Sequence, residues 1–447
     1  IAKDFSGDDK TSELDVNLYQ LVNDVQNNTS DLSYEDLYNL LIKIEEIVYH
    51  ISEISDYFIK DLNIVSLFSQ ILQTTDNREI FEISLIIVQG LIYLSPDALD
   101  IFIQLDLTDL LLTTLNENSA NFGNDDYIIS TILGILQIMI ESQNSHSELK
   151  ILPQLFNFVG ICQNRINENT EVAANLKICL GIFGSFIRFN DKELITQFIS
   201  QFLEIKIFLP FSEYQEETIP IVCDLAGKGF INEVIESGLY QICFDLLNDE
   251  SFKKSYEFIV KLICQFFDFQ TNSESFELTQ DYLDRIVPFN RIYQLLKFYK
   301  DEEIQEACLV LYEKVASIGG LKILLDQEVE EQNKELLIKY LDNGYYLIRS
   351  KVYRLLWDGL LKLNNSVDQV SIMNSPIFIS MTSYVDFLDD SEFIYGIFSF
   401  FEYIFSIIAS STDIKLDQET TNCINSFASE CINCDNEELM QLVNEFL

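Results

Sequence analysis

The sequence predicts an all-α fold, a right-handed α-solenoid of about eight to nine irregular helical repeats. Three observations support it. Apolar residues recur at intervals of three and four along most of the chain, which is the spacing of one face of an α-helix. Pairs of such helices return about every 45 residues. Glycine and proline are scarce, with 15 and 6 in 447 residues, which argues against the turn-dense sandwiches and barrels of β proteins.

The first clear helix is predicted over 32–51. Its apolar residues fall on one stripe: Leu37, Leu40, Leu41, Ile44, Ile47 and Val48. Ser33 and Asp36 stand at its start, where a side-chain oxygen and a carboxylate stabilise the unpaired backbone N–H groups of the first turn. We expect residues 1–54 to form a polar tail with two capping helices, and residues 55–447 to form the repeat solenoid.

From residue 55 onward a unit recurs: a shorter apolar helix, a polar acidic corner, and a longer helix that is apolar on more than one side. The clearest long helices are predicted at Ile80–Leu94, Ile128–Ile140, Phe252–Phe269, Ile304–Ile318, Tyr345–Leu363 and Phe393–Ala409. No single helix pair can bury so much apolar surface. We therefore expect neighbouring units to stack and share one continuous core, with the long helices lining a groove.

The corners between the two helices of a unit are predicted at Asp76, Asp125, Asn169, Glu216, Asp249, Asp301, Asp342, Asp389 and Asp435. Carboxylates at these places precede a long helix and meet the positive end of its dipole, which stabilises the helix by about 0.3–1 kcal/mol each. Much of the acidic excess therefore has a structural use, and paired carboxylates such as Glu302 and Glu303 are interpreted as caps rather than catalytic pairs.

Two segments resemble the armadillo-repeat family. Ile231–Leu247 is similar to the first two helices of a repeat, with a break at Ser237-Gly238 and with Leu239, Ile242, Leu246 and Leu247 expected to face inward. Glu303–Val315 is similar to the third helix, with Ala307 and Cys308 as small residues at the crowded crossing. The resemblance covers roughly Ser55 to Leu447 and implies a HEAT-like or armadillo-like scaffold that binds proteins.

The chain carries 72 acidic and 28 basic side chains and a net charge of −44. This charge opposes binding to nucleic acid or to anionic membranes, whose affinity depends on Lys and Arg. Two interpretations of the acidic excess remain open: it keeps the chain soluble, or it attracts a protein partner with a basic peptide or a basic surface. Nine cysteines, odd in number and scattered, indicate reduced thiols in a cytoplasmic or nuclear protein. Phe393–Ala409 is too short for a typical membrane span and contains Glu402, so we expect a buried helix.

The residues that catalysis needs are scarce. His50 and His146, the two histidines, lie far apart in the sequence and without a motif around them. Cys431 and Cys434 lack the second ligand pair of a zinc site and the βαβ context of a redox motif. Gly227-Lys228-Gly229 lacks the strand and the Ser or Thr of a phosphate loop, and is interpreted as a helix end. We therefore expect no enzyme activity, no metal, no cofactor and no small-molecule substrate.

Within the armadillo family, importin alpha binds basic localisation peptides in its groove, and marks its third helices with Trp and, four residues on, Asn. Here Trp357 is the only Trp, and other polar residues stand near the expected Asn positions. The predicted groove residues are Gln89, Gln137, Gln265, Asp358 and Glu402. The sequence thus predicts a non-enzymatic interaction scaffold that binds a basic or extended partner. Two alternatives remain open: an importin-alpha-like transport adaptor, and a regulatory or scaffold subunit of a complex such as a phosphatase or a ciliary assembly.

Overall fold

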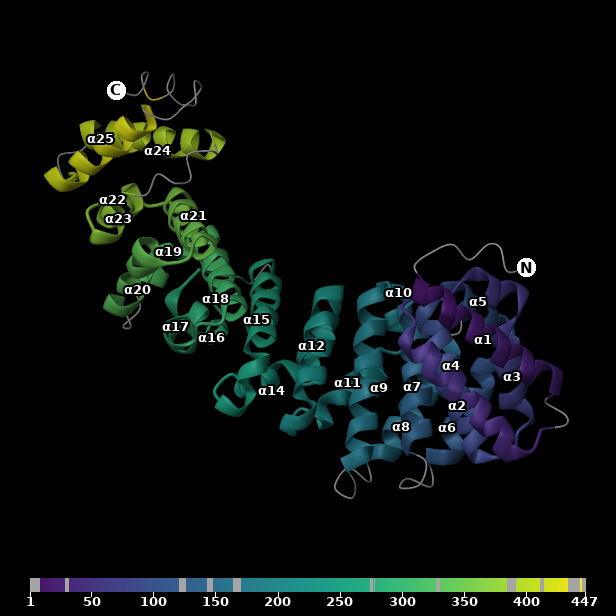
Figure 1. Cartoon of the computed structure of the whole chain (residues 1–447). Helices are drawn as coiled ribbons and strands as arrows, with labels where there is room; N and C mark the ends of the chain where they lie inside the picture. Colours follow the sequence, from purple (N-terminus) through teal and green to yellow (C-terminus); the bar gives the residue numbers. More distant parts are fainter. Residues whose placement is uncertain are drawn as a thin grey trace. The chain divides into compact units, whose positions relative to one another are not determined.

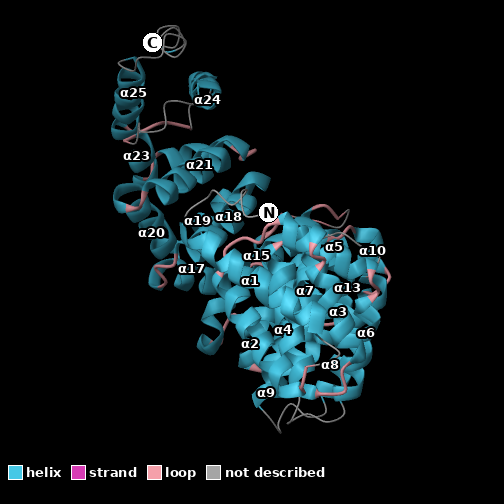
Figure 2. Ribbon diagram, turned by 45° about the vertical axis from the view of Figure 1, so that its right-hand side comes forward, coloured by secondary structure: helices cyan, strands magenta, loops and turns pink. Residues whose placement is uncertain are grey.

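The computed structural model describes residues 9–28, 32–119, 126–142, 148–163, 170–273, 276, 278–326, 330–383, 391–410, 414–432 and 443. Among these residues the regular structure is helical and contains no strand (Figure 2). Contacts divide the chain into two compact units, Ile1–Phe208 and Leu209–Leu447. Within each unit the helices stack in two layers, so the protein is an all-α solenoid, as the sequence predicts.

In unit 1 the inner layer is a row of long helices, each packed against the next: α2 (Tyr34–His50), α4 (Arg78–Leu94), α7 (Asp126–Glu141) and α9 (Thr170–Phe189) (Figure 1). The outer layer consists of α3 (Ile64–Thr74), α5 (Pro96–Gln104), α6 (Leu107–Ser119) and α8 (Glu148–Gln163). The remaining elements are α1 (Asp9–Asn28), which packs against α2, and the shorter η1 (Tyr57–Asp61), α10 (Lys192–Thr196), α11 (Ile199–Leu203) and η2 (Glu204–Ile207).

Unit 2 repeats the arrangement. Its inner row is α12 (Gln215–Leu225), α15 (Tyr256–Thr271), α18 (Glu302–Val315), α21 (Tyr346–Lys362) and α24 (Ser391–Ser410). The other helices are α13 (Ile231–Glu236), α14 (Leu239–Leu246), α16 (Gln280–Ile286), α17 (Phe289–Phe298), α19 (Leu321–Asp326), α20 (Glu330–Asn343), α22 (Ser366–Met373), α23 (Pro376–Thr382) and α25 (Gln418–Ile432). Short helical turns η3 (Ser212–Tyr214), η4 (Ala226–Phe230), η5 (Glu250–Ser255) and η6 (Ala316–Gly320) join them.

The repeat length expected from the sequence is confirmed by the polar contacts between neighbouring repeats. The Arg291 guanidinium donates to the Leu247 carbonyl over a separation of 44 residues. Lys314 pairs with Asp268 over 46, and Thr420 donates to the Met373 carbonyl over 47. Residues about one repeat length apart are therefore close in space, and each unit is held together by contacts between nearest neighbours.

Local sequence accounts for several helix starts. Ser33 accepts a hydrogen bond from the Asp36 N–H at the start of α2, and Asp301 accepts from Glu303 and Ile304 at the start of α18, as expected. At α4 the capping side chain is Asn77, one residue after the predicted Asp76. Asp342 lies in the last turn of α20 rather than in a corner. The predicted corners at Asp125, Asn169, Asp389 and Asp435 lie outside the described residues.

The armadillo-like segment folds as two short helices, α13 and α14, separated at Gly238, whose φ of 82° is the left-handed conformation that glycine adopts without strain. The inward face of α14 is rotated from the expected one. Leu239 and Leu247 are buried as predicted, but Ile242 and Leu246 are only half-buried. Tyr240 and Cys243 are buried in their place, because α14 turns that side toward α13 and α15. In α18, Ala307 and Cys308 are buried, as expected.

Among the described residues, two helices are long and apolar enough to cross a membrane by length and composition alone: Val172–Phe189 and Phe393–Ser410. The core helix of a folded domain passes the same test, and 61% of the first segment is buried in the fold. In the second segment only 33% is buried, so the expectation of a buried helix at Phe393–Ala409 holds for one side of the helix only. One side of α24 carries the core residues Ile397, Phe401 and Ile404, and the other side is exposed.

Candidate functional site

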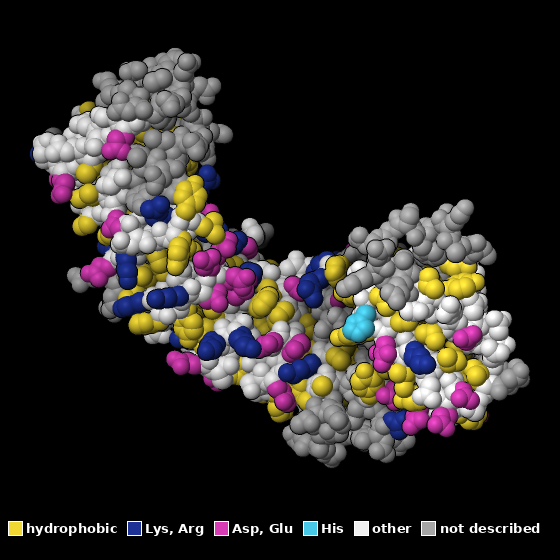
Figure 3. Space-filling model, viewed as in Figure 1, with side chains coloured by type: hydrophobic (Ala, Val, Ile, Leu, Met, Phe, Trp, Pro, Cys, Tyr) yellow, Lys and Arg dark blue, Asp and Glu magenta, His cyan; other side chains and the backbone are white. Residues whose placement is uncertain are grey.

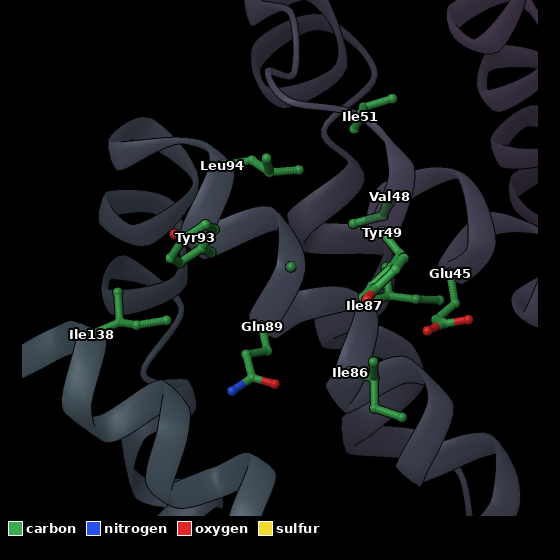
Figure 4. Close-up of a pocket in the computed structure, with 11 residues that line it drawn as sticks. Glu45, Val48, Tyr49, Ile51, Ile86, Ile87, Gln89, Tyr93, Leu94 and Ile138 are labelled. Atoms are coloured by element: carbon green, nitrogen blue, oxygen red, sulfur yellow. The ribbon is translucent and has the colours of Figure 1, made fainter.

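A groove opens on the inner row of unit 1, where α2, α4 and α7 lie next to each other. Its volume is about 350 Å³. Side chains from all three helices contribute, and Ile51 follows the end of α2. The lining residues are Glu45, Val48, Tyr49, Ile51, Ile86, Ile87, Gln89, Gly90, Tyr93, Leu94 and Ile138 (Figure 4).

The most prominent side chains of the groove are two tyrosines. Tyr49 is in the last turn of α2 and Tyr93 in the last turn of α4, 44 residues apart, so they occupy equivalent positions in adjacent repeats. They are 79% and 80% exposed. Figure 4 shows them on opposite sides of the site, with Glu45 beside Tyr49 and with the Gln89 side chain below both rings and directed away from them. Such large exposed aromatic surfaces are typical of binding sites rather than of a protected core.

The floor of the groove is apolar and narrow. Val48 and Ile87 are buried beneath it, while Ile86, Leu94 and Ile138 are half-buried and face the opening. α2 and α4 approach each other closely because the crossing residue is Gly90. A β-carbon at this position would lie 2.6 Å from Cγ1 of Val48, closer than such atoms come in real structures.

Two polar side chains complete the site. Glu45 stands one helical turn before Tyr49 on α2, and Gln89 stands one turn before Tyr93 on α4, so this pair also repeats at 44 residues. The amide of Gln89 occupies the space above Gly134 of α7. Neither side chain makes a hydrogen bond or an ion pair with any residue that the structure describes. Both are therefore able to bind a partner.

Of the predicted groove residues in unit 1, Gln89 lines the groove. Gln137 lies half-buried on the next helix, α7, and donates to Glu141 at 2.9 Å. Glu141 in turn accepts a hydrogen bond at 2.9 Å from the hydroxyl of Ser185 on α9. The structure therefore ties Gln137 into a polar chain between α7 and α9, beside the groove but not among its lining residues.

The other predicted groove residues belong to unit 2. Gln265 on α15 is half-buried against Gly227, and its amide donates to the Cys223 sulfur at 3.8 Å. Asp358 on α21 is half-buried, and Glu402 on α24 is exposed. Trp357 is fully buried among Tyr353, Phe378, Phe401 and Phe427, so it does not offer its ring to a ligand at the surface.

The inner row of unit 2 carries mixed charge rather than a purely acidic lining. Lys314 of α18 pairs with Asp268 of α15 at 2.6 Å, and Lys351 of α21 pairs with Glu306 of α18 at 2.9 Å. Acidic and basic side chains intermingle over this unit in Figure 3. The nearby carboxylate of Glu257 raises the pKa of Glu303, although Lys261 opposes the effect.

Sequence reasoning missed Glu45, Tyr49 and Tyr93. The available signal was their spacing: Glu45 and Gln89, and Tyr49 and Tyr93, are each separated by 44 residues, close to the repeat length. Both predicted helices contain these residues. An aromatic residue near a helix end is ordinary in an apolar helix, however, and only the packing of α2 against α4 shows that both rings face the same opening.

The nucleophilic and metal-binding side chains do not gather here. Burial raises the pKa of Cys223, Cys243 and Cys264 to about 12, so these thiols are neutral at physiological pH. His50 is exposed at the end of α2, whereas His146 and Cys434 lie outside the described residues. Among the residues described, no group of three or more His, Cys, Asp or Glu is arranged to hold a metal ion. Gly229, with φ of 89°, ends a helix rather than forming a phosphate loop.

Comparisons with known proteins agree with the fold. No family model matches the chain, and no curated protein matches it. A chain of a solved structure is similar, with a TM-score of 0.51 and 13% sequence identity, over 97% of this protein and 85% of that chain. That structure comes from work on a phosphorylation switch that controls the interaction between cadherin and beta-catenin. Beta-catenin is an armadillo-repeat protein. At this identity the similarity concerns the fold, a helical-repeat solenoid.

Proposed function

We propose that this protein is a non-enzymatic, armadillo-like interaction scaffold that binds a segment of a partner protein across α2, α4 and α7. The observation that carries the proposal is the groove flanked by the exposed rings of Tyr49 and Tyr93. Tyrosine is enriched among the residues that dominate binding energy at protein interfaces, because it combines a large apolar area with a polar end and few rotatable bonds. A cytoplasmic or nuclear location is part of the proposal.

The shape and chemistry of the groove favour a protein ligand. Its lining comes from adjacent repeats of one inner row, which form a continuous surface along which an extended segment can lie. It combines an apolar floor with a few unpaired polar groups, as peptide-binding surfaces do. The similar solved structure concerns the binding of one protein, cadherin, to another, and so supports a protein partner for this chain by analogy of fold.

No observation favours the transport-adaptor alternative, because Trp357 is in the core and glutamines, not asparagines, stand at Gln89 and Gln137. Similarly, no described feature points to a phosphatase or a ciliary assembly. The scaffold proposal therefore stands without a second candidate.

The test is affinity purification of the full-length chain from its source cells, with mass spectrometry, for three forms of the protein. These are the unchanged chain, the double variant Tyr49→Ala/Tyr93→Ala, and the control Tyr34→Ala. Tyr34 is 66% exposed on the same helix α2 but does not line the groove.

We expect a set of partners that the double variant loses and the control keeps, at unchanged helix content by circular dichroism. A partner set that is identical for all three forms would contradict binding at this groove.

A further inference from the structure

We propose, on the basis of the function proposed above, that the groove recognises a specific kind of segment. It binds one large apolar side chain between Tyr49 and Tyr93, with a single Lys or Arg within two residues of it that pairs with Glu45. The partner is thus a peptide segment with an apolar anchor and one neighbouring cation, rather than a polybasic run.

The apolar anchor follows from the volume and the lining. About 350 Å³ is near the lower end of the range of about 300–1,000 Å³ for drug-sized ligand sites, so the groove admits one or two side chains rather than a folded domain. Apart from Glu45 and Gln89 and the hydroxyl groups of the two tyrosines, its side chains are apolar. Ile86, Leu94 and Ile138 are already half-exposed, so covering them with an apolar side chain removes their surface from water.

The single cation follows from Glu45. Residues four apart on a helix have β-carbons about 5–6 Å from each other, so the Glu45 carboxylate lies one turn from the Tyr49 ring. In an extended peptide, side chains two positions apart project on the same side about 6.6 Å from each other. A Lys or Arg at that distance from the anchor therefore reaches Glu45 and passes over the face of Tyr49, where a cation–π contact adds to the pairing.

Charge around the groove supports a cationic partner. Glu45 is half-buried and has no cationic partner among the described residues, and it is the only charged side chain that lines the groove. Residues 1–208 carry 31 acidic and 11 basic side chains, so the field of this unit attracts a cation. Figure 3 shows acidic side chains next to hydrophobic ones on the face that carries α2 and α4, together with some Lys and Arg side chains.

Gln89 recognises the backbone of the bound segment. Its amide is both a donor and an acceptor, and a backbone segment offers the complementary N–H and C=O groups. Because Gln89 lines the same opening as the two tyrosines, a peptide backbone hydrogen-bonded to its amide lies beside both rings. The apolar contact with the two tyrosines, the ion pair with Glu45 and the backbone hydrogen bond with Gln89 together define an extended segment. Its apolar anchor lies over Gly90.

The experiment uses a phage-displayed library of random 12-residue peptides, selected on the immobilised full chain. Three variants are selected in parallel: Tyr49→Ala/Tyr93→Ala, Glu45→Lys and Glu46→Lys. Glu46 is the matched control, because it is exposed on the same helix at the next position and does not line the groove. Thermal unfolding of each variant verifies that it is folded.

On the unchanged chain and on Glu46→Lys we expect enrichment of a large apolar residue with Lys or Arg within two positions. The Tyr49→Ala/Tyr93→Ala variant should lose this motif. For a synthetic enriched peptide, fluorescence anisotropy should show at least tenfold weaker binding to Glu45→Lys. A peptide in which Glu replaces the cation should recover binding to Glu45→Lys and bind the unchanged chain more weakly.

Enrichment of polybasic or acidic peptides, or equal binding to Glu45→Lys and Glu46→Lys, would overturn this specificity. Those results leave the proposed scaffold function intact if partner capture from cells still depends on Tyr49 and Tyr93. If the peptide motif is not enriched and partner capture does not depend on Tyr49 and Tyr93, the proposed scaffold function at this groove is overturned as well.

Discussion

Gly90 of α4 lies directly against Val48 of α2, so closely that a β-carbon on Gly90 would approach Cγ1 of Val48 to 2.6 Å. Both residues are part of the floor of the groove. The contact therefore sets the distance between the two helices that present Tyr49 and Tyr93, and links the packing of unit 1 to its candidate binding site.

Replacing Gly90 with alanine should destabilise the protein. The added methyl group forces α2 and α4 apart, and overpacking of this kind costs about 1–3 kcal/mol. The control is Gly181→Ala on α9, where a β-carbon meets no other atom within 4 Å. There the greater helix propensity of alanine should stabilise the chain by about 0.5–1 kcal/mol. Urea unfolding followed by circular dichroism measures both effects, and equal shifts for the two variants would contradict the crowding at Gly90.

Gly134→Ala should weaken partner capture with little loss of stability. A β-carbon on Gly134 would collide with the amide nitrogen of Gln89, and because this is the end of a flexible side chain, the amide can swing away. The amide then leaves its position in the groove. We expect an unfolding free energy within about 1 kcal/mol of the unchanged chain, since a moved surface side chain has a small effect. Pull-down yield should fall toward that of Gln89→Ala, and a yield equal to the unchanged chain would argue against a role for the amide.

Arg291→Lys should destabilise unit 2. The guanidinium of Arg291 donates to the Leu247 carbonyl and to the Tyr256 hydroxyl, both at 2.7 Å, and stacks over the Tyr256 ring. A lysine cannot reproduce both hydrogen bonds. A buried polar group that loses its hydrogen-bond partner lowers the free energy of unfolding by about 1–3 kcal/mol. The control Arg285→Lys, at an exposed position on α16, should leave the urea midpoint unchanged. Matching midpoints for the two variants would show that the contacts of Arg291 do not hold the repeats together.

Stability should fall as the pH rises above about 8.5. Burial raises the pKa of Cys223, Cys243 and Cys264 to about 12, whereas an exposed thiol in the unfolded chain ionises near 8.5. The unfolded chain therefore loses these protons first. Each thiol's contribution to the free energy of unfolding is therefore complete below pH 8.5. Between pH 8.5 and about pH 12 it declines by about 1.4 kcal/mol per pH unit. Urea unfolding midpoints measured between pH 7 and 10.5, in the presence of reductant, give the slope of stability against pH. Cys243→Ala should make it shallower, and an unchanged slope would exclude this thiol as a cause.

Phe427→Ala should destabilise the region around Trp357. The two rings lie 6.2 Å apart, and Phe427 is fully buried on α25. Replacing a buried phenylalanine with alanine lowers the free energy of unfolding by about 3–5 kcal/mol. Because Trp357 is the only Trp, its fluorescence reports on this cluster alone, and its emission should shift to the red as water enters. The control Phe405→Ala removes a ring that is 37% exposed on α24, and should leave the emission maximum in place.

Much of the fold is encoded locally. The three- and four-residue spacing predicted the long helices to within a few residues, and the caps at Ser33 and Asp301 follow from hydrogen bonds within one turn. The small residues Ala307 and Cys308 are buried where the helix crossing was expected. The predictions that failed depend on neighbours. Ile242 and the outer side of α24 are more exposed than expected, because the rotation of a helix about its axis is set by the elements packed on it.

The sequence by itself determined that this protein is helical, repetitive and acidic, since helix periodicity, capping and net charge depend on residues that are close along the chain. The tertiary structure decided which side chains share a surface. It placed Gln89 with Glu45, Tyr49 and Tyr93 in one groove of unit 1, whereas Gln265, Asp358 and Glu402 belong to unit 2. The reason is physical: whether two side chains 44 residues apart face the same opening depends on the distance and rotation between packed helices, which contacts such as that between Gly90 and Val48 set.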